Sequence, residues 1–230
     1  MSSSESMLEN KETWTLDPEK YEHMRVARKN VNMQVVEKYL GKPELTKVGR
    51  TFGLVRQGAI EFEEDEEVNS LVDFSMRRQK KGDKTPIEQA IADKLFSDEY
   101  EQEYLRGMIP SHASLFEIIG VATADGYVLL KDCLFPDRLS LRLYDVGFSI
   151  TAIPGTLIFI VAVPVFDIHI SSGISYIFTR NIGELIKREC FMRHKNKEIF
   201  SNEAKRCKLF FHLNRKYGNM IHFIDNAEEY

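Results

Sequence analysis

Two cysteines and two histidines near the C-terminus are spaced like the ligands of a zinc finger. They follow the order Cys190-x3-His194-x12-Cys207-x4-His212, and thiolate with imidazole is a donor set that Zn²⁺ prefers. Helical geometry opposes the site, because five residues turn a helix through about 140° and separate Cys207 from His212. Each cysteine also lies on the apolar face of an expected helix, where a thiol acts as a small hydrophobic side chain. We expect no metal and no other cofactor. The alternative is a zinc site formed by these four residues.

Three aspartates, Asp132, Asp145 and Asp167, stand at or near the ends of expected strands. Strand ends of a small barrel meet at a rim, where carboxylates could serve as acid and base or bind a cation. The simpler interpretation, which we favour, is that each aspartate caps a turn by accepting hydrogen bonds from nearby backbone. These aspartates therefore form the alternative catalytic set, and no residue is assigned as catalytic.

Ser111, His112 and Ser114 lie together where the helical part of the chain gives way to strands. They lack the Gly-x-Ser-x-Gly elbow of a nucleophilic serine, and the chain has no phosphate-binding Gly-x-x-x-x-Gly-Lys loop. We interpret His112 as a junction residue rather than a general base. Whether the chain is an enzyme stays undecided, with the balance against it.

Charge is unevenly distributed along the chain. The segment 180–216 has eleven basic and four acidic residues, or 11 − 4 = +7, so the remainder of the −4 chain has a net charge of −11. Lysines and arginines interleaved with aromatic residues can contact phosphates and stack on bases. The predicted binding residues for a nucleic acid or another partner are Lys187, Arg188, Arg193, Lys195, Lys197, Lys205, Arg206 and Lys208.

The competing interpretation is that these cations complement acidic residues of the same chain or of a second copy. The densest acidic run consists of Glu61, Glu63, Glu64, Asp65, Glu66 and Glu67. A hard cation would accept such oxygens, but the run lacks an Asp-x-Asp-x-Asp-Gly loop. We interpret it as the solvated N-terminus of a helix, where carboxylates interact favourably with the helix dipole.

Helical patterns dominate the first half of the chain. Residues 1–13 are expected to form a flexible tail, and 14–110 a helical region. Asp17-Pro18 starts a helix that Gly41 and Pro43 end, and Thr85-Pro86-Ile87-Glu88 is a capping box that starts another. Ser97-Asp98-Glu99 resembles a further cap. We expect these helices to pack against the strands that follow and to fix the position of any site on them.

The residue pattern changes to strands at Ser111. Residues 111–180 are expected to form an antiparallel β module, a small sheet or partly closed barrel, followed by a basic helical region at 181–230. The chain is therefore α+β, and all its parts are expected to share one core. The expected strands are Leu115–Val121, Tyr127–Cys133, Ser140–Tyr144, Thr156–Pro164, Asp167–Ser171 and Ile174–Thr179.

A series of short motifs in the β module resembles an uncharacterised family of bacterial hypothetical proteins, over roughly residues 50–180. The resemblance implies a bacterial origin and this same plan of helices followed by strands, and it implies no activity. The motifs are Ser114-Leu115-Phe116-Glu117-Ile118, 126–132 (GYVLLKD), 143–149 (LYDVGFS), Pro154-Gly155-Thr156 and Ser172-Gly173-Ile174.

Composition sets the remaining bounds. The chain has 230 residues of ordinary globular composition, which excludes general disorder, and its weak acidity excludes a uniformly basic nucleic-acid binder. Three cysteines suit a reducing cytoplasm, and the apolar run Thr156–Phe166 is too short to span a membrane. We predict a non-catalytic module that binds another macromolecule or assembles with itself. Nucleic acid is the first partner to test, and another protein and a second copy of the chain are the other partners considered. The alternative is an enzyme with an acidic site at the rim of the β module.

Overall fold

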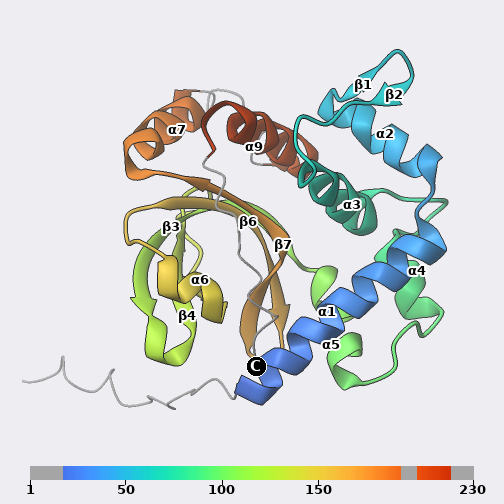
Figure 1. Ribbon diagram of the computed structural model, residues 1–230, viewed down its shortest axis with the longest axis horizontal. Helices are drawn as coiled ribbons and strands as arrows, with labels where there is room; N and C mark the ends of the chain where they lie inside the picture. Colours follow the sequence, from blue (N-terminus) through green and yellow to red (C-terminus); the bar gives the residue numbers. More distant parts are fainter. Residues whose placement is uncertain (1–17, 193–200, 219–230) are drawn as a thin grey trace, which may run out of the picture.

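A closed five-stranded barrel forms the β module, and helices pack against its outer surface (Figure 1). The structure is a computed structural model that describes residues 18–192 and 201–218. The strands are β3 (His112–Ala122), β4 (Tyr127–Asp132), β5 (Leu141–Tyr144), β6 (Leu157–Val165) and β7 (Ile168–Phe178). The predicted α+β class is confirmed, and the barrel is closed rather than partly closed.

The strands follow the order β3-β4-β5-β7-β6, and β6 pairs with β3 to complete the barrel. Neighbours are antiparallel except β5 and β7, which are parallel and share the single registered pair Leu143 and His169. The two strands predicted on either side of Ser172-Gly173 are one strand, β7, whose register with β6 shifts at these residues. Gly173 adopts φ 115°, which glycine tolerates without a turn. Because it has a single registered pair, the β5–β7 contact is the weakest seam of the barrel.

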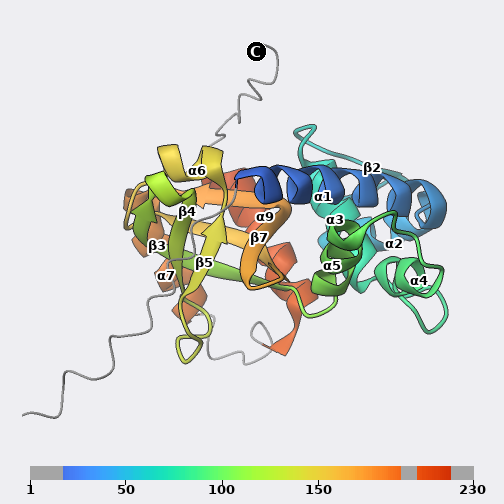
Figure 2. The ribbon, with the colours of Figure 1, turned by 90° about the horizontal axis from the view of Figure 1, so that it is seen from below.

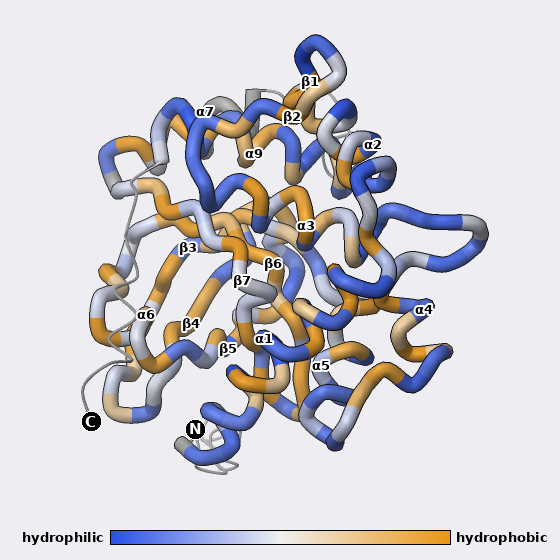
Figure 3. Tube along the Cα trace, turned by 45° about the vertical axis from the view of Figure 1, so that its right-hand side comes forward, coloured by the Kyte–Doolittle hydropathy of each residue, from blue (hydrophilic) through white to orange (hydrophobic). Residues whose placement is uncertain are grey.

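Alternation along the strands separates two apolar clusters. Phe116 and Ile118 join residues of the other four strands in the barrel interior, whereas Ala113 and Leu115 pack with the helices. β6 is buried along nearly its whole length because both of its faces are covered. Figure 3 shows this apolar stretch and the hydrophilic outer loops. Burial on two sides explains why the run that includes β6 is apolar along nearly its whole length.

The first half is helical, as predicted. Its elements are α1 (Pro18–Tyr39), α2 (Lys42–Phe52), the hairpin β1 (Val55–Arg56) and β2 (Ala59–Ile60), α3 (Glu67–Arg78), α4 (Pro86–Ala92) and α5 (Glu99–Met108). The Thr85 capping box and the Asp98 cap are confirmed. α1 ends at Tyr39, just before Gly41 and Pro43 as predicted, and Pro43 also lies in the first turn of α2.

One end of the barrel is covered by α6 (Val146–Thr151), a short helix after β5 that the sequence did not reveal. Phe148 of α6 belongs to the interior cluster, so it fills that end. η1 (Thr123–Asp125) joins β3 to β4 on the same side. Figure 2 shows α6 beside one end of β4 and β5, with the β4–β5 loop at their other end. Among the described residues, α6 covers the first of these two ends and not the second (Figure 2).

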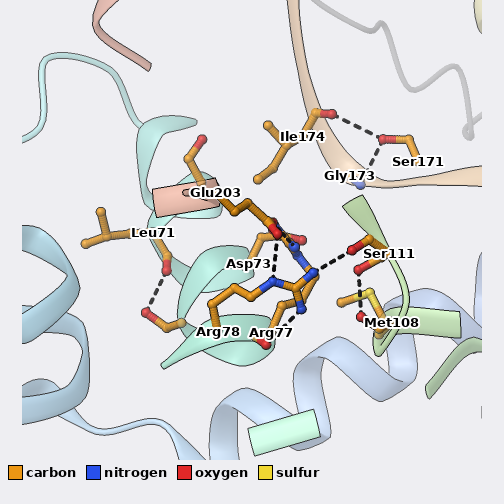
Figure 4. Close-up of polar contacts among 12 residues, drawn as sticks. Leu71, Asp73, Arg77, Arg78, Met108, Ser111, Ser171, Gly173, Ile174 and Glu203 are labelled. Atoms are coloured by element: carbon orange, nitrogen blue, oxygen red, sulfur yellow. Dashed lines mark hydrogen bonds and ion pairs between the residues drawn. The ribbon is translucent and has the colours of Figure 1, made fainter. Parts of the chain in front are cut away.

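Helices α7 (Arg180–Met192) and α9 (Glu203–Tyr217) lie across the outside of the barrel (Figure 1). Buried charges attach α9 to α3. Arg77 donates to Asp73 at 2.7 Å and to Glu203 at 2.6 Å, and Arg78 donates to Glu203 at 2.8 Å (Figure 4). Burial alone would raise the pKa of Glu203, but the two guanidinium groups hold it below its ordinary value. This cluster fixes α9 against the N-terminal helices.

Candidate functional site

A pocket of about 420 Å³ opens at the end of the barrel that α6 leaves uncovered. This volume lies in the range of small-molecule sites. Residues from β3, β4, the β4–β5 loop, β5 and the start of β7 line it, so it lies beside the weak β5–β7 seam. The lining consists of His112, Phe116, Asp132, Arg138, Leu139, Ser140, Leu141, Arg142, Tyr144, Asp167, Ile168 and His169.

His112 and Asp132 face each other at the base of this pocket. His112 Nε2 lies 3.7 Å from Asp132 Oδ2, and both atoms are buried without a hydrogen-bond partner among the described residues. Strand pairing produces the approach, because Asp132 is registered with Phe116 and His112 lies two alternations earlier on the same face of β3. An imidazole beside a buried carboxylate is the arrangement of a base and the group that orients it.

The other oxygen of Asp132 is held by three donors. Oδ1 accepts hydrogen bonds from the Ser114 hydroxyl at 2.6 Å and from the backbone N–H groups of Leu134 and Phe135 at 2.9 and 3.0 Å. These bonds fix the carboxylate and the start of the β4–β5 loop together. Oδ2 is thereby left directed at His112, so the orientation of the pair is set by β3 and β4.

A second imidazole, His169, lines the pocket from β7. Burial lowers its pKa, and the nearby His112 lowers it further. His169 follows the two-residue β6–β7 turn, in which Phe166 has φ 48° and donates its N–H to Glu103. A phenylalanine in the left-handed region is strained, and such strain gathers at functional sites. The turn therefore positions both Asp167 and His169 at the pocket.

Two arginines line the same pocket and lie over aromatic rings. The Arg138 guanidinium carbon is 4.6 Å from the centre of the Phe135 ring, and that of Arg142 is 5.5 Å from the Tyr127 ring. Arg138 Nη1 approaches Asp132 Oδ2 only to 4.0 Å. Burial raises the pKa of Tyr144, and the charge of Arg142 opposes that rise. The tyrosine is therefore neutral beside a cation.

The structure divides the three predicted aspartates. Asp132 and Asp167 line the pocket, whereas Asp145 lies outside it and caps α6 by accepting from Phe148 N–H at 2.9 Å. Asp132 accepts backbone hydrogen bonds at a turn as well, so it combines both interpretations. The sequence did not single out His112 as a base or His169 at all. One clue was available in the sequence. His112 and His169 stand at the start of strands β3 and β7, and Asp132 stands at the end of β4, so all three lie near strand ends.

The cysteine and histidine spacing does not assemble a site within the described residues. Cys207 is buried, which raises the pKa of its thiol to about 12, and His212 Nε2 contacts the Phe52 carbonyl oxygen at 2.8 Å. The side chain of Cys190 and the whole of His194 lie outside the described residues. Across 18–192 and 201–218, no three His, Cys, Asp or Glu side chains gather as metal ligands.

The basic residues of the C-terminal region differ in environment. Arg206 is buried and donates to the carbonyl of Ala113 at 3.0 Å, while Arg188, Lys205 and Lys208 are exposed. The side chain of Lys187 and the residues Arg193, Lys195 and Lys197 lie outside the described part. Arg215 pairs with Glu67 of the acidic run, so part of the charge is complemented within the chain. Binding of nucleic acid stays a prediction.

Comparison with known proteins places the chain in a family. No curated protein and no solved structure matches it. No described helix is both long enough and apolar enough to cross a membrane. A family model described as "Family of unknown function (DUF7986)" matches residues 16–224, which includes the helices, the barrel and α9. The sequence-based expectation of an uncharacterised family is thus confirmed, and the chain belongs to this family of unknown function.

Proposed function

We propose that the protein is an enzyme that binds a small molecule in the barrel pocket, with His112 as its general base. The facing of His112 Nε2 and Asp132 Oδ2 at 3.7 Å, both buried and without a hydrogen-bond partner among the described residues, carries the proposal. That distance exceeds a hydrogen bond, but catalytic hydrogen bonds are often this long until substrate binds. Asp132 is a positioning residue, because it acts on the substrate only through His112.

We assign different tasks to the two nitrogens of His112. Nε2 faces Asp132, so Nδ1 is the nitrogen that would accept a proton from a molecule in the pocket. Ser114 is fully buried and donates its hydroxyl hydrogen to Asp132, which makes it unsuitable as a nucleophile. Water is therefore the nucleophile that this pair would activate.

Hydrolysis of an ester is the simplest reaction that this arrangement supports. Nδ1 takes one proton from water while the water oxygen bonds to the carbonyl carbon or phosphorus of the substrate. The bond to the leaving oxygen then breaks, and the proton on His112 passes to that oxygen. Water and ester give an acid and an alcohol, and no further reactant is needed. The cationic pocket wall would stabilise charge on the substrate oxygens.

The macromolecule-binding hypothesis has weaker support. Of its eight predicted residues, Arg206 is committed to a backbone carbonyl inside the protein. The pocket, in contrast, gathers ionisable groups from four strands at one place. Perturbed or unpaired ionisable groups in a cleft are a stronger indication of function than exposed lysines are.

The test is hydrolysis of 4-nitrophenyl butyrate and 4-nitrophenyl phosphate by the wild type, His112→Gln and Asp132→Asn. Loss of a general base should lower kcat/KM by about 10²- to 10⁴-fold in His112→Gln. Asp132→Asn should lower kcat mainly, with a smaller change in KM, and Asp132→Glu should restore part of kcat. His23→Gln, at an exposed histidine of α1, is the matched control for surface imidazole reactivity.

Equal rates for the wild type and His112→Gln would reject the proposal, as would absence of hydrolysis combined with slow carbethoxylation of His112. Diethyl pyrocarbonate acylates an accessible imidazole nitrogen, so His112 of the wild type should be modified if Nδ1 faces the pocket as proposed. Peptide mass spectrometry locates the modified histidine.

A further inference from the structure

We infer that the barrel pocket takes an amphipathic anion, whose oxyanion group is bound by Arg138 and Arg142 and whose apolar body lies against Leu139, Leu141 and Ile168. The oxyanion is a carboxylate or a phosphoryl group. This inference rests on the proposed function only in that it concerns the same pocket. It concerns what binds there and makes no claim about the reaction.

The described arginines of this protein differ in how they are paired. Arg77, Arg78 and Arg215 donate to carboxylates at 2.6–2.8 Å. Arg138 instead lies over Phe135 with its side chain 48% exposed, and its nearest carboxylate oxygen is 4.0 Å away. Arg142 lies over Tyr127 and beside the hydroxyl of Tyr144, and it forms no ion pair with the part of the chain that the structure describes.

Stacking on a ring holds a guanidinium in place without using up its N–H donors. Two such groups that line one pocket can therefore donate to a ligand, and the planar guanidinium fits the oxygens of a carboxylate or phosphate. Two aspartates also line the pocket, in different environments. Asp132 is held by three donors and faces His112, and Asp167 lies in the exposed β6–β7 turn.

One side of the pocket is apolar. Leu139 lies between Arg138 and Ser140 at the mouth, and it is 92% exposed. Leu141, Ile168 and Phe116 continue an apolar lining inward. A fully polar anion would leave this surface in contact with water, whereas an alkyl or aromatic body would cover it and gain from its burial.

The experiment compares two probes that share a ring system. 8-Anilinonaphthalene-1-sulfonate is an amphipathic anion, and N-phenyl-1-naphthylamine is its neutral counterpart. Fluorescence titration of the full chain should give one site for the anion and weaker binding of the neutral probe. Arg138→Gln with Arg142→Gln should raise the Kd of the anion at least tenfold and leave that of the neutral probe within twofold. Leu139→Ser should weaken both.

Two matched controls locate the binding. Arg50→Gln removes an exposed arginine of α2, and Ile150→Ser removes an exposed apolar side chain of α6 at the covered end of the barrel. Neither should change the Kd of either probe. If Ile150→Ser removes anion binding and the arginine variants do not, the inference is wrong.

Displacement then distinguishes the two oxyanions. Decanoate, decyl phosphate and decanol are titrated against the bound sulfonate. Displacement by either anion at concentrations at least tenfold below decanol supports the inference and names the preferred group, while equal displacement by decanol overturns it. The proposed function is judged separately, because His112→Gln should keep anion binding within about threefold while abolishing hydrolysis. Loss of hydrolysis in His112→Gln with no anion preference would reject this inference alone.

Discussion

Arg215 and Glu67 form a two-armed ion pair across 148 positions of the sequence. Arg215 Nε donates to Glu67 Oε1 at 2.6 Å, and Nη2 donates to Oε2 at 2.7 Å. Glu67 begins α3 and Arg215 lies in the last turn of α9, so each charge is also favourable for its own helix dipole. The acidic run and the basic C-terminal helix thus meet inside one chain.

Arg215→Gln should lower the free energy of unfolding by about 2 kcal/mol, because the buried Glu67 would lose a charged, bidentate partner. Burial alone would raise the pKa of Glu67, but hydrogen bonds from Arg215 hold it below its ordinary value. The contribution is therefore present above about pH 4.5 and lost as the pH falls further. Urea denaturation at pH 7 measures it. Arg56→Gln breaks the exposed pair with Glu61 and should cost under about 1 kcal/mol.

Gly107→Ala should destabilise the packing of α5 on β6. A Cβ at this position would lie 1.9 Å from the carbonyl oxygen of Pro164, so helix and strand would have to separate. We expect a loss of about 3 kcal/mol in thermal or urea unfolding. Gly147→Ala in α6 meets only ordinary contacts, and it should be neutral or stabilising by up to about 1 kcal/mol. Similar effects of the two substitutions would contradict this packing.

Lys94→Gly should stabilise the protein. Lys94 follows α4 with φ 54°, and two backbone bonds, Leu95 N–H to Ala90 and Lys94 N–H to Ile91, form a Schellman motif around it. Glycine adopts this left-handed conformation without strain, so the midpoint of urea unfolding should rise by the equivalent of about 1 kcal/mol. Lys94→Ala keeps the strain and should leave the midpoint unchanged. A gain from alanine equal to that from glycine would point to the lysine charge instead.

His169 should make stability depend on pH near neutrality. Because burial and then His112 lower its pKa in the fold, the unfolded chain binds a proton first as the pH falls below about 6.5. His169 therefore leaves the free energy of unfolding unchanged above about pH 6.5 and lowers it below that pH, by less than about 1.4 kcal/mol per pH unit. Unfolding of wild type and His169→Asn at pH 7.5 and 5.5 should show a smaller decline in the variant. The free energy of unfolding of His23→Asn should decline between these two pH values as that of the wild type does.

Features that depend on neighbouring residues were predictable from the sequence. The Thr85 capping box is complete within four residues: Thr85 N–H donates to Glu88 Oε2, and Glu88 N–H donates to the Thr85 hydroxyl. The Asp98 cap has the same span, and alternation of apolar residues indicated the strands. The α+β plan follows from these local patterns. Uncharacterised family membership was also expected, from the order of motifs in the β module.

The candidate site depends on the tertiary structure. His112 and Asp132 are twenty positions apart, and they meet because β3 pairs with β4 in one register rather than the next. A shift of one residue would turn Asp132 to the outer face. β7 continues through Ser172-Gly173 because pairing with β6 on both sides of them outweighs the local preference of Ser-Gly for a turn.

The sequence by itself determined the helix starts at Thr85 and Asp98 and the strand-forming segments of the barrel, since each depends on residues close together in the chain. It also determined the uneven distribution of charge, which is a matter of composition alone. Only the tertiary structure decided that α6 covers one end of the barrel, that the other end holds two histidines, two arginines and Asp132, and that Arg215 pairs with Glu67. The physical reason is that these contacts join residues 20 to 148 positions apart. Their formation depends on strand order and register, which no local pattern encodes.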